Sequence, residues 1–368
     1  MKAQTVKFAK GHNEEFYKVL KQRVADHFKT SNIARHGNVN MVLKSIFMIS
    51  LYVVPYFLML LYFESSLMIL LMWVLMGAGM AGIGLSIMHD ANHGSYSKNQ
   101  GVNNVLGYII TLIGGNDVNW RIQHNVLHHT YTNVSGVDED IDSGILLRFS
   151  PHEPRFSNHK YQHIYAWFLY GMMTMMWSTV KDFKQLFRYK RMELLKTQNV
   201  KFVSSLTILI VSKIAYYIAV LVLPLIYSNM SILGTIGCYL AMHFVCGLIL
   251  GAIFQPAHVV PSSNYPVPDA SGNIEADWAV NQLYNTTNFA PRARLFSWYV
   301  GGLNYQVEHH LFPNICHVHY RKIADIVRKT AIEYNLPYNS QKTFGKALVS
   351  HGKMLYNLGH YDNAPGLH

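Results

Sequence analysis

Four long apolar stretches decide what this chain can fold into. They cover about residues 45–63, 67–88, 202–227 and 232–255, and a helix needs roughly 20 apolar residues to cross the hydrocarbon core of a bilayer. Only 14% of the 368 residues are charged, whereas a soluble globular chain carries about a quarter. The expected fold class is therefore an all-α integral membrane protein with four transmembrane helices in a lipid bilayer.

Basic residues predict how these helices are oriented. The connections at 64–66 and 228–231 contain no Lys or Arg, whereas residues 1–44 and 181–201 are rich in both. Because basic loops stay in the cytoplasm, we expect two transmembrane hairpins with both chain ends in the cytoplasm. The same rule is the preferred explanation of the net charge of +11, with attraction to anionic lipid or to a phosphorylated substrate carrier as the alternative. The sequence contains no recognisable aromatic–basic module, which argues against binding to nucleic acid.

The remaining segments are expected to form a helical cap on the cytoplasmic side. Residues 1–44 are interpreted as an amphipathic arm, residues 45–330 as the membrane and catalytic domain, and residues 331–368 as a cytoplasmic tail. The apolar segment at 164–180 is interpreted as interfacial, because a fifth span would place later histidines across the bilayer from earlier ones. Glycines at 77–82 match a dinucleotide-binding pattern, but they lie inside an apolar helix and instead favour close helix packing.

Histidines gather in four short groups near the ends of the apolar stretches. They are His89 and His93; His124, His128 and His129; His258; and His309 and His310. Neutral imidazole binds iron, copper, zinc and nickel well, and a catalytic zinc usually takes three protein ligands. Eight histidines on one membrane face therefore predict two metal ions with open positions for oxygen or water. On an α-helix, His124 and His128 would share a face, and His129 would stand about 100° round from His128.

Three histidine motifs follow one another in a familiar order. They are His89-Asp-Ala-Asn-His93, His124-Asn-Val-Leu-His128-His129 and Gln306-Val-Glu-His309-His310. Among four apolar stretches, from about residue 40 to 330, this order resembles the membrane fatty acid desaturases. Gln306, with Leu311-Phe312-Pro313 after the motif, resembles their front-end branch, which includes linoleoyl-CoA-type enzymes.

The resemblance implies a chemistry and its cofactors. Two iron ions, molecular oxygen and two external electrons would remove two hydrogens from an unactivated acyl chain, and zinc is expected to substitute for iron in recombinant protein. His258 stands where the family has an additional ligand. The chain has no His-Pro-Gly-Gly of a fused cytochrome domain, so a separate ferredoxin or cytochrome donor is implied. Gln306 stands where the wider family often has histidine; it would be an amide ligand, a water-mediated contact or no ligand.

Further residues are candidates for supporting roles. Asp90, Asp138, Asp140 and Glu308 are expected to accept the outer ring N–H groups of ligating histidines, unless they are solvated loop acids. Trp120, Met172, Met173 and Trp177 are candidates for lining a narrow apolar tunnel for the acyl chain, with ordinary packing as the alternative. The acyl carrier is left open between CoA, acyl carrier protein and lipid.

The expected function is an oxygen-dependent fatty acyl desaturase that makes unsaturated fatty acids. Its active site would face the cytoplasm, in the inner membrane of a bacterium or the endoplasmic reticulum of a eukaryote. One alternative is a di-iron hydroxylase, whose product gains an oxygen instead of losing two hydrogens. A second is a non-enzymatic metal transporter or receptor, although transport sites lie near the bilayer midplane and these histidines begin where the apolar stretches end.

Overall fold

The computed structural model describes residues 6–9, 14–142 and 144–362, and the chain divides into two compact units. Unit 1 is built mainly from Asn38–Ile122 and Trp167–Ala252. Unit 2 is built from Ala3–Gly37, Gln123–Ala166 and Ile253–His368. Each unit therefore combines stretches that are far apart in the sequence.

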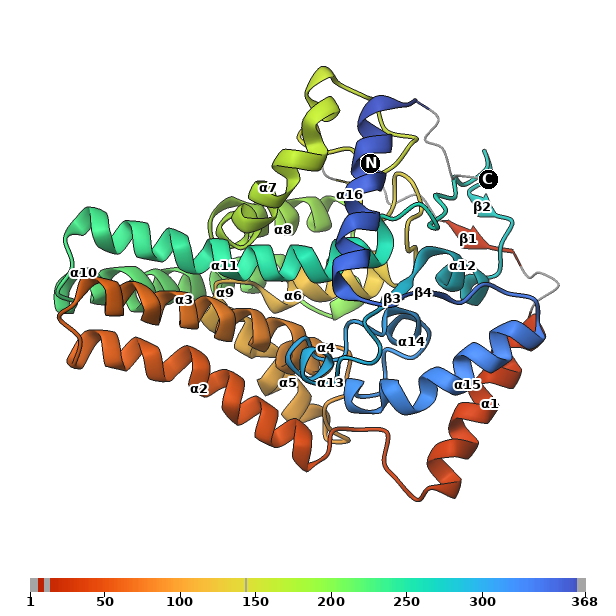
Figure 1. Ribbon diagram of the computed structural model, residues 1–368, viewed down its shortest axis with the longest axis horizontal. Coiled ribbons are helices and arrows are strands. Elements are labelled where there is room, and N and C mark those ends of the chain that lie inside the picture. The colour runs from red at the N-terminus through yellow and green to blue at the C-terminus, as the bar shows by residue number, and fades with distance from the viewer. Residues whose placement is uncertain (1–5, 10–13, 143, 363–368) are drawn as a thin grey trace. The chain divides into compact units, whose positions relative to one another are not determined.

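Four helices of unit 1 are long and apolar enough to cross a membrane. They are α2 (Val39–Leu61), then α3 (Ser66–Gly82) with η1 (Ile83–Met88) and α4 (His89–Asn92), then α9 (Phe202–Tyr217) with η7 (Ile218–Val222) and α10 (Leu223–Tyr227), and finally α11 (Ile232–His258). The four expected stretches therefore form four helices, and α2 begins six residues before the expected residue 45. Figure 1 shows α2 and α3 running side by side.

The outer faces of these helices carry large apolar side chains that a soluble protein would bury. Leu43, Phe47 and Phe57 of α2 are exposed, as are Val203 and Val211 of α9. A helix pairs its own backbone N–H and C=O groups, so its backbone is stable in lipid. Apolar side chains are favourable in contact with lipid and unfavourable in contact with water. The protein is accordingly an integral membrane protein.

Glycines let α3 approach its neighbours closely. A Cβ atom on Gly79 would lie 2.6 Å from the backbone nitrogen of Tyr52 in α2. One on Gly77 would lie 2.6 Å from the backbone oxygen of Met242 in α11. Small residues of this kind allow helix backbones to pack together in a membrane, so helix packing, and not a dinucleotide site, accounts for the glycine pattern.

Shorter elements complete unit 1. They are α5 (Gln100–Tyr108), η2 (Ile109–Ile113), α6 (Asp117–Trp120), η3 (Arg121–His128), which runs into unit 2, α7 (Gln162–Met176), which begins in unit 2, η5 (Trp177–Lys181), α8 (Asp182–Arg191) and η6 (Leu194–Gln198). The segment expected to be interfacial, 164–180, forms most of α7 and η5, which are not among the four helices above.

Lys213 is buried inside a candidate span. Its Nζ atom lies 2.6 Å from a carboxylate oxygen of Asp182 and also donates to the backbone oxygens of Gly114 and Trp177. A lysine in a span is costly unless it is paired inside the protein. The ion pair and the two carbonyls meet that requirement.

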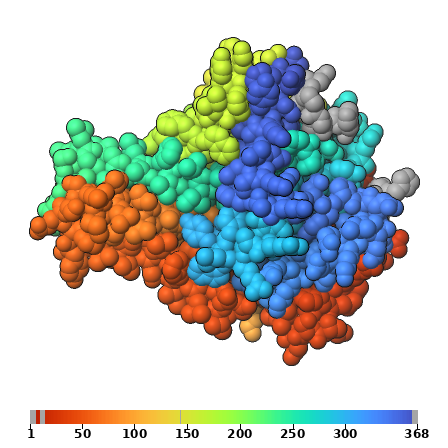
Figure 2. Space-filling model, in the orientation of Figure 1, coloured from red at the N-terminus to blue at the C-terminus, as the bar shows by residue number. Residues whose placement is uncertain are grey.

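Unit 2 is mainly helical and adds two short parallel strand pairs to the expected all-α fold. Its helices are α1 (Glu14–Thr30), η4 (Ser157–Tyr161), α12 (Trp278–Asn285), α13 (Arg294–Tyr299), α14 (Gln306–Leu311), η8 (His317–His319), α15 (Tyr320–Glu333) and α16 (Phe344–His360). Strand β1 (Lys7–Phe8) pairs with β2 (Asn273–Ile274), and β3 (Thr287–Phe289) pairs with β4 (Asn339–Gln341). Helix α16 lies on the visible face in Figure 2.

The N-terminal arm packs into the core of unit 2. Phe16, Leu20 and Val24 lie on one face of α1 and join a buried apolar cluster with residues of α12, α14 and α15. Figure 1 shows α1 beside α15. The amphipathic pattern of the arm is therefore explained by packing within the protein, and the same cluster holds α14 in place.

Candidate metal centre

Six of the eight predicted histidines lie together in unit 2. His124 and His128 belong to η3, His129 follows it, His258 ends α11, and His309 and His310 belong to α14. All six are buried. Two sets offer ring nitrogens within 4.8 Å of one another: His128, His258 and His310, and His129, His309 and His310.

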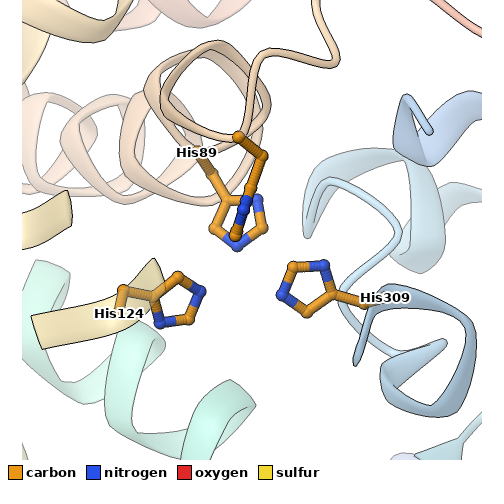
Figure 3. A group of neighbouring side chains, drawn as sticks. His89, His124 and His309 are labelled. Carbon is orange, nitrogen blue, oxygen red and sulfur yellow. The ribbon is translucent and has the colours of Figure 1, made fainter. Parts of the chain in front are cut away.

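The ring nitrogens of this cluster face each other. The Nε2 atom of His129 lies 3.2 Å from that of His124 and 2.9 Å from that of His309. The rings of His124 and His309 are turned toward each other, with centroids 5.8 Å apart (Figure 3). Such a buried, nitrogen-rich set of donors suits a transition metal ion that prefers imidazole.

A π-helical turn produces part of this arrangement. The backbone N–H of His129 donates to the oxygen of His124, five residues earlier, over 2.9 Å, and residues 121–128 form the π-helix η3. On an α-helix only His128 would share a face with His124, whereas this turn also brings His129 to that face. A π-helix has more residues per turn than an α-helix, so His124 lies close to both His128 and His129.

The outer ring nitrogens are held by acceptors. The Nδ1 atom of His128 donates to Asp138 at 2.9 Å, that of His258 to the backbone oxygen of Asn285 at 3.0 Å, and that of His310 to Oε1 of Gln282 at 2.9 Å. The opposite nitrogen of His258, Nε2, is buried without a hydrogen-bond partner in the part of the chain that is described. Fixing Nδ1 in this way selects the tautomer whose Nε2 is free to bind a metal.

Carboxylates surround one side of the cluster. A carboxylate oxygen of Asp140 lies 3.5 Å from Nδ1 of His128 and 3.9 Å from Nδ1 of His124. Burial alone would lower the pKa of His128, but Asp138 and Asp140 outweigh it and raise that pKa to about 9. A metal ion bound by His128 must therefore displace a proton.

The other two predicted histidines belong to unit 1. His89 begins α4 and His93 directly follows its last residue, with ring centroids 4.7 Å apart. Asp90 Oδ1 lies 3.5 Å from Nδ1 of His89. The ring of Trp120 meets both histidine rings edge-on at 5.6 Å, so Trp120 packs against the first histidine motif.

Comparison with known proteins gives the family. The family model for fatty acid desaturases matches residues 64–342. The chain belongs to the fatty acid desaturase family. Its relatives in this family are oxidoreductases, so membership favours an enzyme over the transporter or receptor.

Relatives within the family are similar over nearly the whole chain. The chain is 37% identical over 362 residues to an acyl-lipid (8-3)-desaturase of Physcomitrium patens, covering 97% of this chain and 74% of the relative. It is 34% identical over 359 residues to an sn-1 linoleoyl-lipid 6-desaturase of Arthrospira platensis, covering 97% and 96%. An enzyme with the latter name from Synechocystis is 32% identical, covering 97% and 98%. These relatives support the front-end type.

Gln306 and Glu308, two polar residues of α14, make different hydrogen bonds. Gln306 donates through Nε2 to the backbone oxygen of Leu303 at 2.7 Å, while its Oε1 is buried without a hydrogen-bond partner among the described residues. The Glu308 carboxylate accepts from Asn288 Nδ2 at 2.8 Å and from the Tyr338 hydroxyl at 2.9 Å, and burial raises its pKa to about 7. Glu308 thus anchors α14, whereas Gln306 presents an amide oxygen.

Some supporting residues were not found from the sequence, and some candidates lie elsewhere. Gln282 and Asn285 of α12, and Tyr320, whose hydroxyl lies 3.2 Å from Nδ1 of His309, carry no motif that marks them. Of the proposed tunnel residues, Met172, Met173 and Trp177 are half-buried. Unit 1 contains an apolar cavity of about 540 Å³ lined by residues such as Phe57, Leu112 and Val211, and none of these three candidates lines it.

Proposed function

We propose that this family member is an oxygen-dependent front-end acyl-lipid desaturase with two iron ions. The observation that carries the proposal is the buried cluster of six unit 2 histidines, whose ring nitrogens lie close together. Acceptors hold Nδ1 of His128, His258 and His310. The proposed ligands are His89, His93, His124, His128, His129, His258, His309 and His310. The unit 1 pair, His89 and His93, is included because of its one-turn spacing in the first motif.

The residues fit the group that the family implies. Imidazole suits iron, and Nε2 of His258, which has no hydrogen-bond partner among the described residues, carries a lone pair that can bind a metal ion because Nδ1 holds the ring proton. Iron bound by this set would supply the chemistry that removes two hydrogens from an acyl chain. Molecular oxygen and two external electrons would be consumed in that reaction. In recombinant protein, zinc would occupy the same imidazole donors.

The chain's own residues prepare the site. Asp138, Gln282 and the Asn285 carbonyl orient His128, His310 and His258, respectively. Glu308 secures α14 through Asn288 and Tyr338. We propose that Asp90 and Asp140 serve His89 and His124 in the same way. Burial of the cluster limits access by bulk water, which protects reactive chemistry from side reactions.

The proposal also covers the orientation of the protein in the membrane, its acyl carrier and its electron donor. Two hairpins, α2 with α3 and α9 with α11, would place the histidines at the cytoplasmic face under a cap formed by unit 2. The basic segments favour this orientation. Two of the relatives are named for a linoleoyl-lipid, which favours an acyl chain carried on a lipid. Electrons would come from a separate ferredoxin or cytochrome.

The test is product analysis in a host that makes linoleoyl lipids. We expect a new acyl chain two mass units lighter, which requires oxygen, and loss of that product with His128→Ala. His360→Ala is the matched control, because His360 lies at the end of α16 outside the six-histidine cluster. Metal analysis should give two ions per chain. A product heavier by one oxygen would replace the desaturase with a hydroxylase, and one ion or fewer in folded protein would refute the di-metal site.

A further inference from the structure

Asn133 is a fully buried residue in a backbone conformation that few side chains adopt. It follows the second histidine motif in unit 2, and its φ angle is 58°. This left-handed region is unfavourable for most residues, and asparagine is among the few besides glycine that enter it. Such a conformation persists only where the surrounding structure holds it, often at a functional site. Two contacts hold Asn133, one through its backbone and one through its side chain.

The backbone N–H of Asn133 holds the carboxylate behind His128. This N–H donates to Oδ2 of Asp138 at 2.8 Å. The same oxygen accepts from Nδ1 of His128 at 2.9 Å. Because Asp138 is buried, donors within the protein must satisfy its carboxylate. Asn133 therefore helps to set the orientation of Asp138, and through it the direction in which the His128 ring points.

The side chain of Asn133 holds the main chain of His258. Its Nδ2 atom donates to the backbone oxygen of His258 at 3.0 Å and to that of Asn264 at 3.2 Å. His258 is the last residue of α11, where backbone carbonyls have no partner within the helix. The Asn133 amide supplies that partner, so it fixes the backbone from which the His258 ring extends.

His128 and His258 belong to the same group of candidate metal ligands. Their ring nitrogens and those of His310 lie within 4.8 Å of one another, and the His128 and His258 ring centroids are 4.7 Å apart. No hydrogen bond of Asn133 among the described residues reaches the other group of close nitrogens. That other group consists of Nε2 of His124, His129 and His309.

We propose that Asn133 is a positioning residue for one of the two metal ions, the ion held by His128, His258 and His310. It joins the hydrogen-bond partner of one ligand to the main chain of another, so the separation of the two imidazoles is set before a metal ion binds. The left-handed backbone directs the N–H at Asp138, and the amide reaches His258. This inference rests on the proposed di-metal function.

The test is titration of the metal-free, full-length protein with cobalt(II), whose visible absorption reports imidazole binding. Asn133→Gly accepts the left-handed backbone and removes only the amide. It should raise the dissociation constant of one ion about 10- to 100-fold, the usual effect of losing an outer partner of a metal ligand, and leave the other ion unchanged. Asn133→Ala should raise it further, because alanine is strained in this conformation and the N–H to Asp138 would shift.

A double-mutant cycle with His258→Ala tests the route. His258→Ala should weaken the same ion as Asn133→Gly. Because Asn133→Gly acts through His258, adding it to His258→Ala should cause no further loss of cobalt affinity, whereas independent effects would multiply. Multiplying effects, or equal weakening of both ions by Asn133→Gly, would overturn the positioning role.

Gln162→Ala is the matched control for the loss of a buried amide. Gln162 is also fully buried in unit 2, and its Nε2 donates to the backbone oxygens of Arg148 at 3.2 Å and Leu355 at 2.8 Å. Gln162→Ala should lower the thermal unfolding midpoint, as Asn133→Gly does, and leave both cobalt affinities unchanged. Unchanged affinities in folded Asn133→Gly would overturn this proposal alone. Binding of one cobalt ion or none by the folded, unmodified protein would overturn the di-metal function beneath it.

Discussion

The Gln306 side chain is held by its amide nitrogen, so its oxygen is available. Nε2 donates to the Leu303 carbonyl and Oε1 is buried without a hydrogen-bond partner among the described residues. An amide oxygen is a harder donor than imidazole and binds soft or borderline metals less tightly. If Gln306 is a ligand, it would leave its ion more open than a histidine would.

Substitutions at Gln306 test this role. Gln306→Ala should lose most activity while keeping much of the metal, because the histidines remain. His309→Ala should lose metal as well. Gln306→His should restore substantial turnover if the position needs only a metal donor. Metal content and turnover, measured together on each purified variant, check the prediction, and full activity of Gln306→Ala would show that the residue has no role in the site.

A buried histidine outside the cluster should make stability depend on pH. The Nδ1 atom of His351 donates to the Val259 carbonyl at 2.8 Å, and burial lowers its pKa to about 4. The unfolded chain then binds this proton more readily than the folded one. His351 contributes stability above about pH 6.5, and this contribution is lost as the pH falls toward 4, by up to about 3 kcal/mol.

The matched variant is His351→Gln, which keeps a hydrogen-bond donor and cannot titrate. We expect its free energy of unfolding to fall less between pH 6.5 and 4 than that of the unmodified protein. Thermal unfolding in detergent across this pH range measures the difference. Parallel pH curves for the two proteins would contradict the prediction.

Sequence motifs predict the clustered histidines well, but they do not predict most of the residues that hydrogen-bond to those histidines. The second and third motifs predict His124, His128, His129, His309 and His310, and the position after the last apolar stretch predicts His258. These six residues lie in one buried cluster. Asp138 was also selected, because carboxylates commonly accept from metal-binding histidines. Gln282 and Asn285 are single polar residues on α12, 28 residues from His310 and 27 from His258 in the sequence, respectively. Only the tertiary fold gives them their role.

At the scale of elements, apolar length was a sufficient signal for the four long helices. The π-helical turns were not foreseeable in this way. An α-helix and a π-turn accept the same side chains, and tertiary packing selects between them, frequently at functional sites. For η3 the distinction decides which histidines are neighbours.

The ion pair between α8 and α9 supports a prediction at this scale. Lys213→Met alone would leave the buried Asp182 carboxylate without its cation and should cost about 3–5 kcal/mol of stability. Lys213→Met combined with Asp182→Leu should recover most of that loss, because apolar residues can replace a buried ion pair with little cost. Thermal unfolding of both single variants and the double variant measures the coupling. A double variant no more stable than Lys213→Met would refute it.

For the whole molecule, the orientation in the membrane is testable with cysteine labelling. The native residues Cys238, Cys246 and Cys316 are buried, so the background should be low. A membrane-impermeant maleimide added outside should label Glu64→Cys and Asn229→Cys, which lie in the connections without basic residues. It should not label Ile145→Cys, although Ile145 is exposed in the structure. Labelling of Ile145→Cys from outside would refute the four-span arrangement.

The interleaving of the two units sets an order of events during synthesis. When the ribosome has made residue 252, unit 1 is present, but only three of the six clustered histidines have been made. His258, His309 and His310 all come from the last third of the chain, as do their partners Asn285, Gln282 and Tyr320. The proposed set of metal ligands is therefore complete only after residue 310 has been made. A chain that ended near residue 252 would contain the four apolar stretches of the membrane bundle and lack His258, His309 and His310.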